Sequence, residues 1–133
     1  MEIRVLHEED YDETLIKWWS DNGFPAPAKD SLPDNGKGGF MVYKRDVNIC
    51  TGFLYQTNSK TAWCEFIVAN KEYREKDRGE AIELLIDTIS IFAKELGYNA
   101  IYTSLTHPVL ISRYEKCGYV SASKNCTEMI KRL

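Results

Sequence analysis

The order of hydrophobic and polar positions predicts that the chain begins with a strand and a short helix. Residues 2–6 alternate polar and apolar side chains, as a strand with one buried face does. Glu8, Glu9 and Asp10 follow, and carboxylates are stabilised near a helix N-terminus. We therefore expect a helix that starts at these residues. Its buried face is expected to carry Tyr11, Leu15, Trp18 and Trp19.

Three further apolar runs predict an antiparallel meander of strands. The runs 40–44, 49–56 and 62–69 are rich in aromatic and β-branched residues, and short polar turns separate them. The last run is nearly continuous in hydrophobicity, as expected for a strand that is covered on both faces. Only Glu65 interrupts it. This carboxylate is therefore the first candidate for a functional side chain in the sheet.

A single apolar stripe predicts the longest helix. Hydrophobic residues recur at three- and four-residue spacing, which places them on one side of a helix: Ala81, Ile82, Leu85, Ile86, Ile89, Phe92, Ala93 and Leu96. Gly97 is expected to end the helix in a left-handed conformation. The run 100–105 then predicts a strand parallel to the run 62–69, because a strand–helix–strand unit normally returns by a right-handed crossover.

The remaining elements complete an α/β (α+β) fold. A short helix is expected to begin after Pro108 and to end at Gly118, and residues 128–133 are expected to form a last strand. Between residues 22 and 39, prolines forbid a long regular element, so we expect a loop with one short helix. The predicted architecture is a mixed, mainly antiparallel central sheet flanked by helices, in a single domain that spans residues 1–133.

Composition narrows the class of protein. At 133 residues, with 44% hydrophobic and 28% charged side chains, the chain suits one domain with one core. Its net charge of -3 and pI near 5.4 argue against a nucleic-acid-binding protein, because phosphate neutralisation needs a basic surface. No apolar run approaches the roughly 20 residues of a membrane-spanning helix. The N-terminus has no signal region, so we expect a cytoplasmic protein without a membrane partner.

Cysteine and histidine usage gives no support for a metal site. The four cysteines lack C-x-x-C spacing, and we expect buried thiols rather than disulfides or zinc ligands; they are Cys50, Cys64, Cys117 and Cys126. The two histidines are His7 and His107, which makes a metal centre unexpected.

The charged segment 74–79, between the run 62–69 and the long helix, has two interpretations. Arg74 and Arg78 can grip phosphate oxygens in bidentate fashion, and the first turn of the helix offers free backbone N–H groups. In that case the segment binds an anion. Alternatively, Asp77 followed by Glu80 is a capping-box pattern, and the segment is an ordinary helix start with solvated charges. Local sequence leaves both interpretations open.

The segment 74–79 also takes part in a wider resemblance. It reads Arg-Glu-Lys-Asp-Arg-Gly and is similar to the signature Arg/Gln-x-x-Gly-x-Gly/Ala of the GNAT superfamily of acetyl-coenzyme A-dependent N-acyltransferases. A second segment, 107–119, is similar to that family's pattern of Asn, several apolar positions and Tyr-x-x-x-Gly-Phe, with Tyr114, Gly118 and Tyr119 in place. With the predicted order of elements, the resemblance covers nearly the whole chain.

Two positions depart from the family pattern. Asp77 stands where the signature has its first glycine, and a carboxylate beside a pyrophosphate repels it unless neighbouring cations screen the charge. One solution is that Asp77 points away as the N-cap while Arg74, Lys76 and Arg78 face the ligand. His107 takes the place of the usual Asn, and either side chain can hydrogen-bond to the pantetheine arm.

The resemblance implies transfer of an acetyl group from acetyl-coenzyme A to a primary amine by direct attack. Glu65 is then the candidate base, directly or through water, because an alkylammonium must lose a proton before it attacks. Tyr114 is the candidate acid for the departing thiolate. The alternative role of Glu65 is a strand carboxylate that faces solvent or pairs with a neighbouring basic residue. The alternative role of Tyr114 is an aromatic that packs the short helix on the sheet.

The same resemblance implies a set of residues that contact the cosubstrate. Backbone N–H groups near the candidate base would stabilise charge on the thioester oxygen, and the charged segment would bind the pyrophosphate. The expected contacts with coenzyme A are Phe66, Ile67, Val68, Arg74, Lys76, Arg78, Gly79, Glu80, His107 and Tyr114.

The acceptor remains open at this stage. Trp18, Trp19 and Phe24, with the loop 22–39, would line the acceptor side of the pocket, and core packing is their alternative role. The acceptor would be a small-molecule or peptide amine, and a second copy of the chain is left open as a partner. A rival hypothesis keeps the fold without the chemistry: a module that binds coenzyme A weakly or not at all and works through protein contacts.

Overall fold

The computed structural model describes residues 1–133 and is built around one five-stranded sheet with strand order β1-β2-β3-β4-β5. The strands are β1 (Glu2–Val5), β2 (Gly39–Lys44), β3 (Val47–Tyr55), β4 (Thr61–Ala69) and β5 (Ala100–Tyr102). The first four pair antiparallel, and β5 pairs parallel to β4. The predicted mixed, mainly antiparallel sheet is confirmed.

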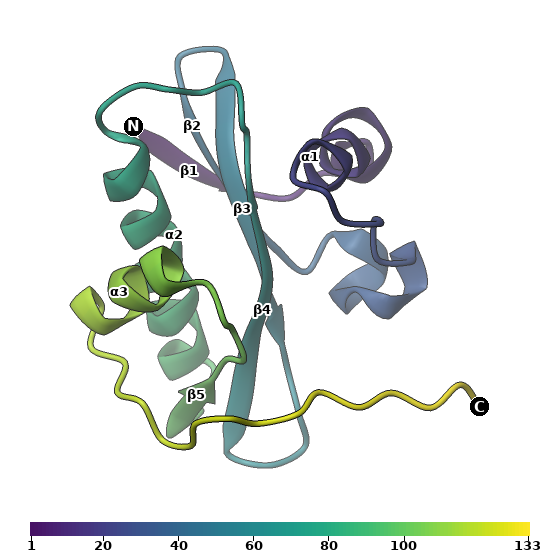
Figure 1. Cartoon of the computed structure of the whole chain (residues 1–133), viewed down its shortest axis with the longest axis vertical. Helices are drawn as coiled ribbons and strands as arrows, with labels where there is room; N and C mark the ends of the chain where they lie inside the picture. The colour runs from purple at the N-terminus through teal and green to yellow at the C-terminus, as the bar shows by residue number, and fades with distance from the viewer.

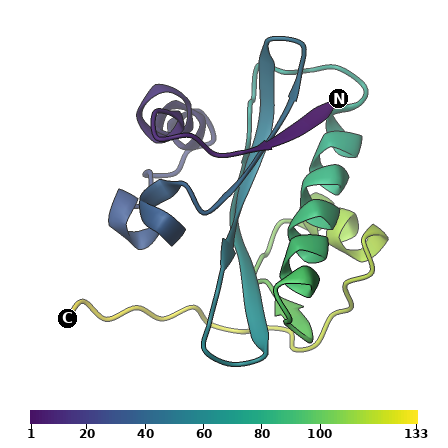
Figure 2. The same ribbon diagram turned by 180° about the vertical axis from the view of Figure 1, so that it is seen from behind.

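Helical segments cover both faces of this sheet. They are the π-helical turn η1 (Tyr11–Leu15), α1 (Ile16–Asp21), the 3-10 turns η2 (Lys29–Ser31) and η3 (Pro33–Gly36), α2 (Arg78–Glu95) and α3 (Pro108–Lys116). Figures 1 and 2 show α1 and the 3-10 turns on one side of the sheet, and α2 and α3 on the other. None of these helices is long and apolar enough to cross a membrane.

The core lies in two layers, one on each face of the sheet. On the α2 face, Leu85, Ile86 and Ile89 pack against Val42 and Leu54. This confirms the predicted stripe of the long helix, and Gly97 follows it with φ +97° as expected. On the α1 face, a second cluster includes Leu15, Trp18, Trp19, Met41 and Phe53. The sheet is thus held between two apolar layers.

The two tryptophans of α1 belong to the core and not to an acceptor pocket. Trp18 and Trp19 are each 4% exposed, and Trp19 stacks on Phe53 with ring centroids 6.4 Å apart. The hypothesis that they line the acceptor side was therefore wrong, because burial against β3 is the stronger use of two large rings. Phe24 is 63% exposed on the loop that follows.

Three other expectations need correction. The first helix begins at Tyr11 rather than at Glu8, because the Asp10 carboxylate holds the preceding turn by bonds to the His7 N–H (2.6 Å) and the Arg4 guanidinium (2.8 Å). The loop 22–39 holds two 3-10 turns instead of one short helix. The predicted last strand over 128–133 is absent, and those residues are exposed and unpaired.

The missing strand has a physical reason in its own pattern. Met129 and Ile130 are adjacent, and in a strand they would point to opposite faces, so the segment has no single apolar face to bury. Figures 1 and 2 show the C-terminal segment passing the end of the sheet toward the α1 side. As a result, β5 is the edge of the sheet.

Candidate functional site

Backbone pairing between β4 and β5 covers only the first residues of β4. Beyond it, side-chain hydrogen bonds connect β4 to the chain that follows β5. Backbone pairing stops at Trp63 opposite Tyr102. Past this point, Glu65 Oε1 accepts a hydrogen bond of 2.8 Å from the Ser104 N–H. The Tyr114 hydroxyl lies 3.2 Å from Cys64 Sγ and 3.5 Å from Thr103 Oγ1. Both candidate catalytic residues are therefore placed at the opening between β4 and β5.

A bulge in β4 lies beside this opening. Thr51 pairs with Val68 and Phe53 with Glu65, so Phe66 and Ile67 face the single residue Gly52 of β3. Phe66 has φ +58°, a strained conformation for an aromatic residue, and strain of this kind is concentrated at functional sites. The bulge interrupts the regular alternation of β4 where N–H groups were expected to face a thioester oxygen.

Gly52 lets the bulge pack closely on α2. A Cβ added to it would lie 3.0 Å from Ile67 Cγ1 and 3.2 Å from Ile89 Cδ1. The backbone of β3 can thus approach α2 closely only without a side chain. Ile67 turns into the α2-side cluster, while Phe66 is 42% exposed.

Tyr114 is buried on the α3 side of the opening. The residue is 3% exposed, and its ring packs edge to face on Tyr119 with centroids 4.8 Å apart. Burial, with the nearby Cys64 thiol, raises the pKa of Tyr114 far above its ordinary value, so the hydroxyl keeps its proton at neutral pH. Burial also raises the pKa of Cys64 to about 12, which keeps it a thiol and removes it as a nucleophile.

Glu65 lies on the other face of β4 and is partly buried. Burial raises its pKa, the Ser104 N–H opposes that effect, and the Glu128 carboxylate adds to it. Because a raised pKa brings a carboxylate closer to the working range of a general base, this environment suits proton transfer. No basic side chain forms an ion pair with Glu65, and its carboxylate stays half-exposed at the sheet opening.

The N-terminus of α2 presents free donors. The amide N–H groups of Gly79 and Glu80 lie in its first turn, and neither donates to another group of the chain. Arg74, Lys76 and Arg78 precede or begin the helix, and none of them forms an ion pair. Free N–H groups with unpaired cations around them make a binding site for an anion such as a pyrophosphate. The donor set fits the diphosphate of coenzyme A.

Arg113 is a further cation here that sequence reasoning missed. Its guanidinium lies over Gly79, within 2.4 to 2.7 Å of where a Cβ would stand, and Nη1 pairs with Glu83 Oε2 at 2.7 Å. A side chain larger than hydrogen at position 79 would displace it. The only sequence signal was its position next to Tyr114 on α3. The glycine of the charged segment therefore has a packing role as well.

Asp77 is at the N-cap position of α2 but does not cap the helix with its side chain. Its carboxylate instead accepts bonds from Lys44 Nζ (2.8 Å) and the Tyr73 hydroxyl (2.6 Å). The capping-box interpretation is therefore wrong for Asp77. The bonds from Lys44 and Tyr73 hold the pKa of Asp77 below its usual value, so it is an anion with a paired cation.

Comparison with solved structures identifies the architecture. Glucosamine-6-phosphate N-acetyltransferase from Arabidopsis thaliana superposes with a TM-score of 0.68 at 15% identity, over 98% of each chain. A Bacillus subtilis acetyltransferase in complex with coenzyme A gives a TM-score of 0.61 at 23% identity, over 88% of this chain and 74% of that one. The chain has the GNAT fold. A scan against protein-family models and a search of curated proteins give no match.

The GNAT fold by itself does not settle the activity. A transcriptional regulator from Bacillus halodurans is also similar, with a TM-score of 0.70 at 14% identity, over 97% of this chain and 99% of that one. One fold serves different functions, so function must be argued from the site.

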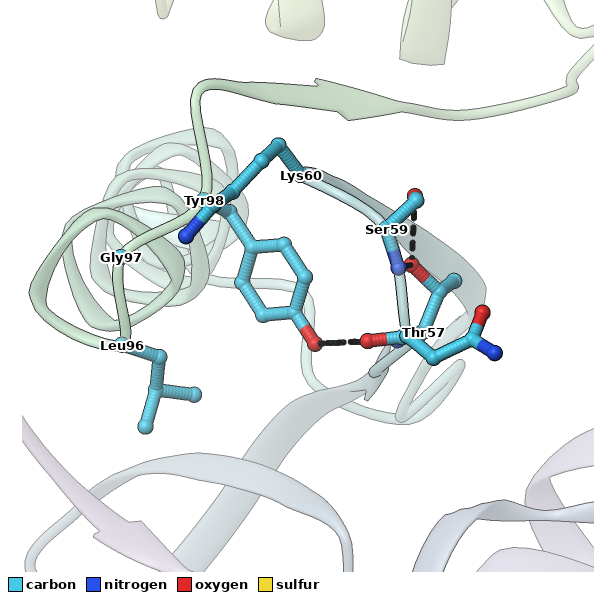
Figure 3. A pocket seen from close by; sticks show the side chains of 7 residues that line it. Thr57, Ser59, Lys60, Leu96, Gly97 and Tyr98 are labelled. Atoms are coloured by element: carbon cyan, nitrogen blue, oxygen red, sulfur yellow. Dashed lines mark hydrogen bonds between the residues drawn. The ribbon is translucent and has the colours of Figure 1, made fainter.

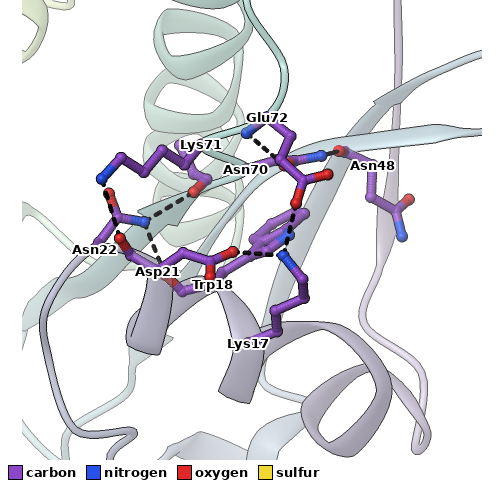
Figure 4. A network of polar contacts seen from close by, with 9 residues as sticks. Lys17, Trp18, Asp21, Asn22, Asn48, Asn70, Lys71 and Glu72 are labelled. Carbon is purple, nitrogen blue, oxygen red and sulfur yellow. Dashed lines mark hydrogen bonds and ion pairs between the residues drawn. The ribbon is translucent and has the colours of Figure 1, made fainter.

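In this GNAT fold, a network of polar contacts joins the end of α1 to the segment that follows β4 (Figure 4). Lys17 Nζ pairs with Asp21 (2.6 Å) and with Glu72 (2.8 Å), and the Asn22 amide donates to the Ala69 carbonyl (3.2 Å). Exposed ion pairs of this kind contribute little to stability. Their effect is to tie the end of α1 to the chain segment that leads to the cations of the site.

Two cavities lie away from the candidate site of this GNAT fold. One, of about 310 Å³, is lined by the β3–β4 turn and the end of α2, where the Tyr98 hydroxyl donates to the Thr57 carbonyl at 2.9 Å (Figure 3). The other, of about 420 Å³, lies between the end of α2 and β5.

His107 is exposed without a side-chain hydrogen bond. No group of three His, Cys, Asp or Glu side chains is placed to hold a metal.

Asp77→Gly is expected to strengthen coenzyme A binding to this fold. It removes an anion beside the cations of the charged segment and frees Lys44, while the thermal unfolding temperature falls because two side-chain bonds are lost. Isothermal titration calorimetry with coenzyme A measures the first effect. Asp77→Asn, which removes the charge but keeps one acceptor oxygen, should also lower Kd. An unchanged Kd in both variants would show that the Asp77 charge is not felt at the site.

Proposed function

We propose that this protein is an N-acetyltransferase that moves an acetyl group from acetyl-coenzyme A to a primary amine by direct attack. The observation that carries the proposal is the placement of Glu65 and Tyr114 at one opening between β4 and β5, on opposite faces of β4. An acceptor approaching from the α1 side meets a carboxylate, and a leaving group on the α3 side meets a phenol. This is the division of tasks that acyl transfer to an amine needs.

Coenzyme A would be held by the N-terminus of α2 and the charged segment. The N–H groups of Gly79 and Glu80 bind phosphate oxygens, and Arg74, Lys76 and Arg78 supply the positive charge. Bound acetyl-coenzyme A supplies the activated acyl group as a thioester. N–H groups in the bulge of β4 at Phe66 to Val68 stabilise negative charge on the acyl oxygen. His107 at the start of α3 contacts the pantetheine arm.

Glu65 removes the proton that an ammonium must lose. A primary amine has a pKa near 10 and is charged at neutral pH, so nitrogen cannot attack until a base accepts its proton. Glu65 is partly buried with a raised pKa, and the Ser104 N–H fixes one of its oxygens. Its other oxygen takes the proton directly or through a water molecule.

Tyr114 stabilises the departing sulfur as a hydrogen-bond donor and keeps its own proton. A thiolate leaves with a conjugate-acid pKa near 8.5, and the protonated Tyr114 hydroxyl stabilises it by donating a hydrogen bond. Thr103 and Cys64 hold the hydroxyl at the opening. The rival hypothesis is a module of the same fold without activity, and it depends on repulsion between the Asp77 carboxylate and the pyrophosphate. The ion pair with Lys44 offsets the negative charge of Asp77.

Glu65→Gln tests the proposed function through the pH dependence of its effect. Near pH 7 the variant is expected to transfer acetyl groups about 100-fold or more slowly, since general-base catalysis typically contributes that much. The ratio of wild-type to variant rates should fall as the pH rises through 10 and approach one above it, where most of the amine is already neutral. The rate of thiol release measures both.

The matched control is Glu115→Gln, the same change on the exposed surface of α3. It should leave the rate unchanged at every pH. The glutamine at position 65 can still accept the Ser104 N–H, so the local fold is retained. A Glu65→Gln variant as active as the wild type near pH 7 would remove Glu65 as the base. No thiol release by wild-type protein with any amine would overturn the proposed function.

A further inference from the structure

A row of aromatic side chains crosses the α1 face of the sheet beside Glu65. Tyr55 of β3 stands directly opposite Trp63 of β4, and Trp63 is directly opposite Tyr102 of β5. Trp63 meets Tyr102 edge to face with ring centroids 5.2 Å apart. Side chains at directly opposite positions of neighbouring strands are in reach of one another. The three aromatic residues therefore occupy neighbouring positions in one row across three strands, which we call the aromatic strip.

The strip lies on the same face as the candidate base. Cys64 and Ile101 belong to the α2-side cluster, so the alternation along each strand places Trp63, Glu65 and Tyr102 on the other face. Phe66 of the bulge extends the strip, with its ring centroid 6.2 Å from that of Tyr55. The Glu65 carboxylate is thus bordered by aromatic rings.

These rings are not fully buried in the core. Tyr102 is 53% exposed and Phe66 is 42% exposed, although each is a large hydrophobic side chain. Trp63 and Tyr55 are half-buried, and the Tyr55 hydroxyl is fixed by a 2.7 Å bond to the Ser31 carbonyl. Clustered exposed aromatics mark binding surfaces more often than single exposed residues do.

The charges at this surface are negative. Glu65 is the carboxylate of the strip, and the charge of Glu128 in the C-terminal segment acts on it. Burial, and after it the charge of Glu65, raises the pKa of Tyr55 to about 12, so the Tyr55 hydroxyl feels the charge of that carboxylate. Aromatic faces and a carboxylate together attract a cation.

We propose that the acceptor is a primary alkylammonium carried on an apolar body, with its cation at Glu65 and its body across Trp63 and Tyr102. This inference rests on the proposed function and names its substrate class. A sugar phosphate would bring an anion to the Glu65 and Glu128 carboxylates, which repel it. An apolar monoamine matches both the rings and the single carboxylate among them.

Binding of 2-phenylethylamine to the protein alone, without acetyl-coenzyme A, tests this inference. The chain has three tryptophans, and the buried Trp18 and Trp19 should not respond, so the indole N–H resonance of Trp63 gives a specific NMR readout. At pH 7 the amine should shift this resonance with a dissociation constant at least several-fold below that of the uncharged 2-phenylethanol. Glucosamine 6-phosphate should produce no shift at the same concentrations.

Two variants separate the charge from the rings. Glu65→Gln should abolish the preference for the amine over the alcohol. Trp63→Leu should weaken amine binding roughly 3- to 30-fold, followed through the backbone amide of Phe66, because it removes the ring face. Phe92→Leu, a partly exposed aromatic on α2 across the sheet, is the matched control and should change nothing.

The inference is overturned by equal affinities for amine and alcohol, by a Trp63 resonance that does not respond at millimolar amine, or by binding of the sugar phosphate instead. Because these measurements contain no acetyl-coenzyme A, they do not depend on catalysis. Amine binding without thiol release would sustain the inference about the surface and contradict the proposed function alone.

Discussion

Tyr114→Phe is expected to lower kcat for acetyl transfer by about 100-fold or more while leaving the affinity for acetyl-coenzyme A nearly unchanged. The change removes one hydroxyl at the opening between β4 and β5 and keeps the ring that packs on Tyr119. A general acid contributes to the step in which the thiolate departs, so its loss appears in kcat. Steady-state thiol release and calorimetry measure the two quantities.

Tyr119→Phe is the matched control for this prediction. Tyr119 is the neighbouring ring of the same pair, and its hydroxyl lies 3.2 Å from Ser90 Oγ, away from the opening. Tyr114→Phe loses the contacts with Cys64 Sγ and Thr103 Oγ1, and Tyr119→Phe loses the one with Ser90 Oγ, at about 1 kcal/mol of stability for each bond. Loss of stability in both variants with loss of rate in Tyr114→Phe alone separates chemistry from folding. Unchanged turnover in Tyr114→Phe would remove the general-acid assignment.

Arg78→Ala is expected to raise the Kd for coenzyme A about 10- to 100-fold. Arg78 begins α2, is half-buried, and has no acidic partner in the protein, so its guanidinium is free to bind phosphate. Hydrogen bonds to charged groups contribute about 1.5 to 3 kcal/mol, which corresponds to that range of affinity. Calorimetric titration at fixed ionic strength measures the change.

Lys94→Ala, in the last turn of the same helix, is the control for Arg78→Ala. It makes the same change of charge at the far end of α2, roughly 24 Å away at 1.5 Å per residue. Its Kd for coenzyme A should equal that of the wild type. If both variants bind equally well, the charged segment does not hold the phosphates.

The sequence predicted the regular elements well because each carries a local signal. The stripe of α2 and the apolar run of β4 show their periods directly. The last strand was predicted wrongly, since an apolar tendency at Met129 and Ile130 does not supply a partner strand. Trp18 and Trp19 were placed at the acceptor side because a helical pattern does not say what will cover its apolar face.

The candidate site was predictable only in part. Glu65 stood out as a charge in an apolar run, and Tyr114 through a spacing pattern. The Lys44 to Asp77 pair and the position of Arg113 over Gly79 join segments far apart in sequence, and no local pattern encodes them. The aromatic strip could have been predicted from the sequence. Alternation in β4 puts Trp63 and Glu65 on one face, and the β3–β4 turn sets the register that places Tyr55 opposite Trp63.

The measurement that tests the central claim most directly is titration of wild-type protein with acetyl-coenzyme A, followed by calorimetry and thermal unfolding. Free N–H groups at Gly79 and Glu80 with unpaired cations around them predict saturable heat and an unfolding temperature that rises with ligand concentration, because ligand bound to the native state stabilises it by mass action. No heat and no stabilisation at millimolar acetyl-coenzyme A would contradict the assignment of this site and of the acetyltransferase.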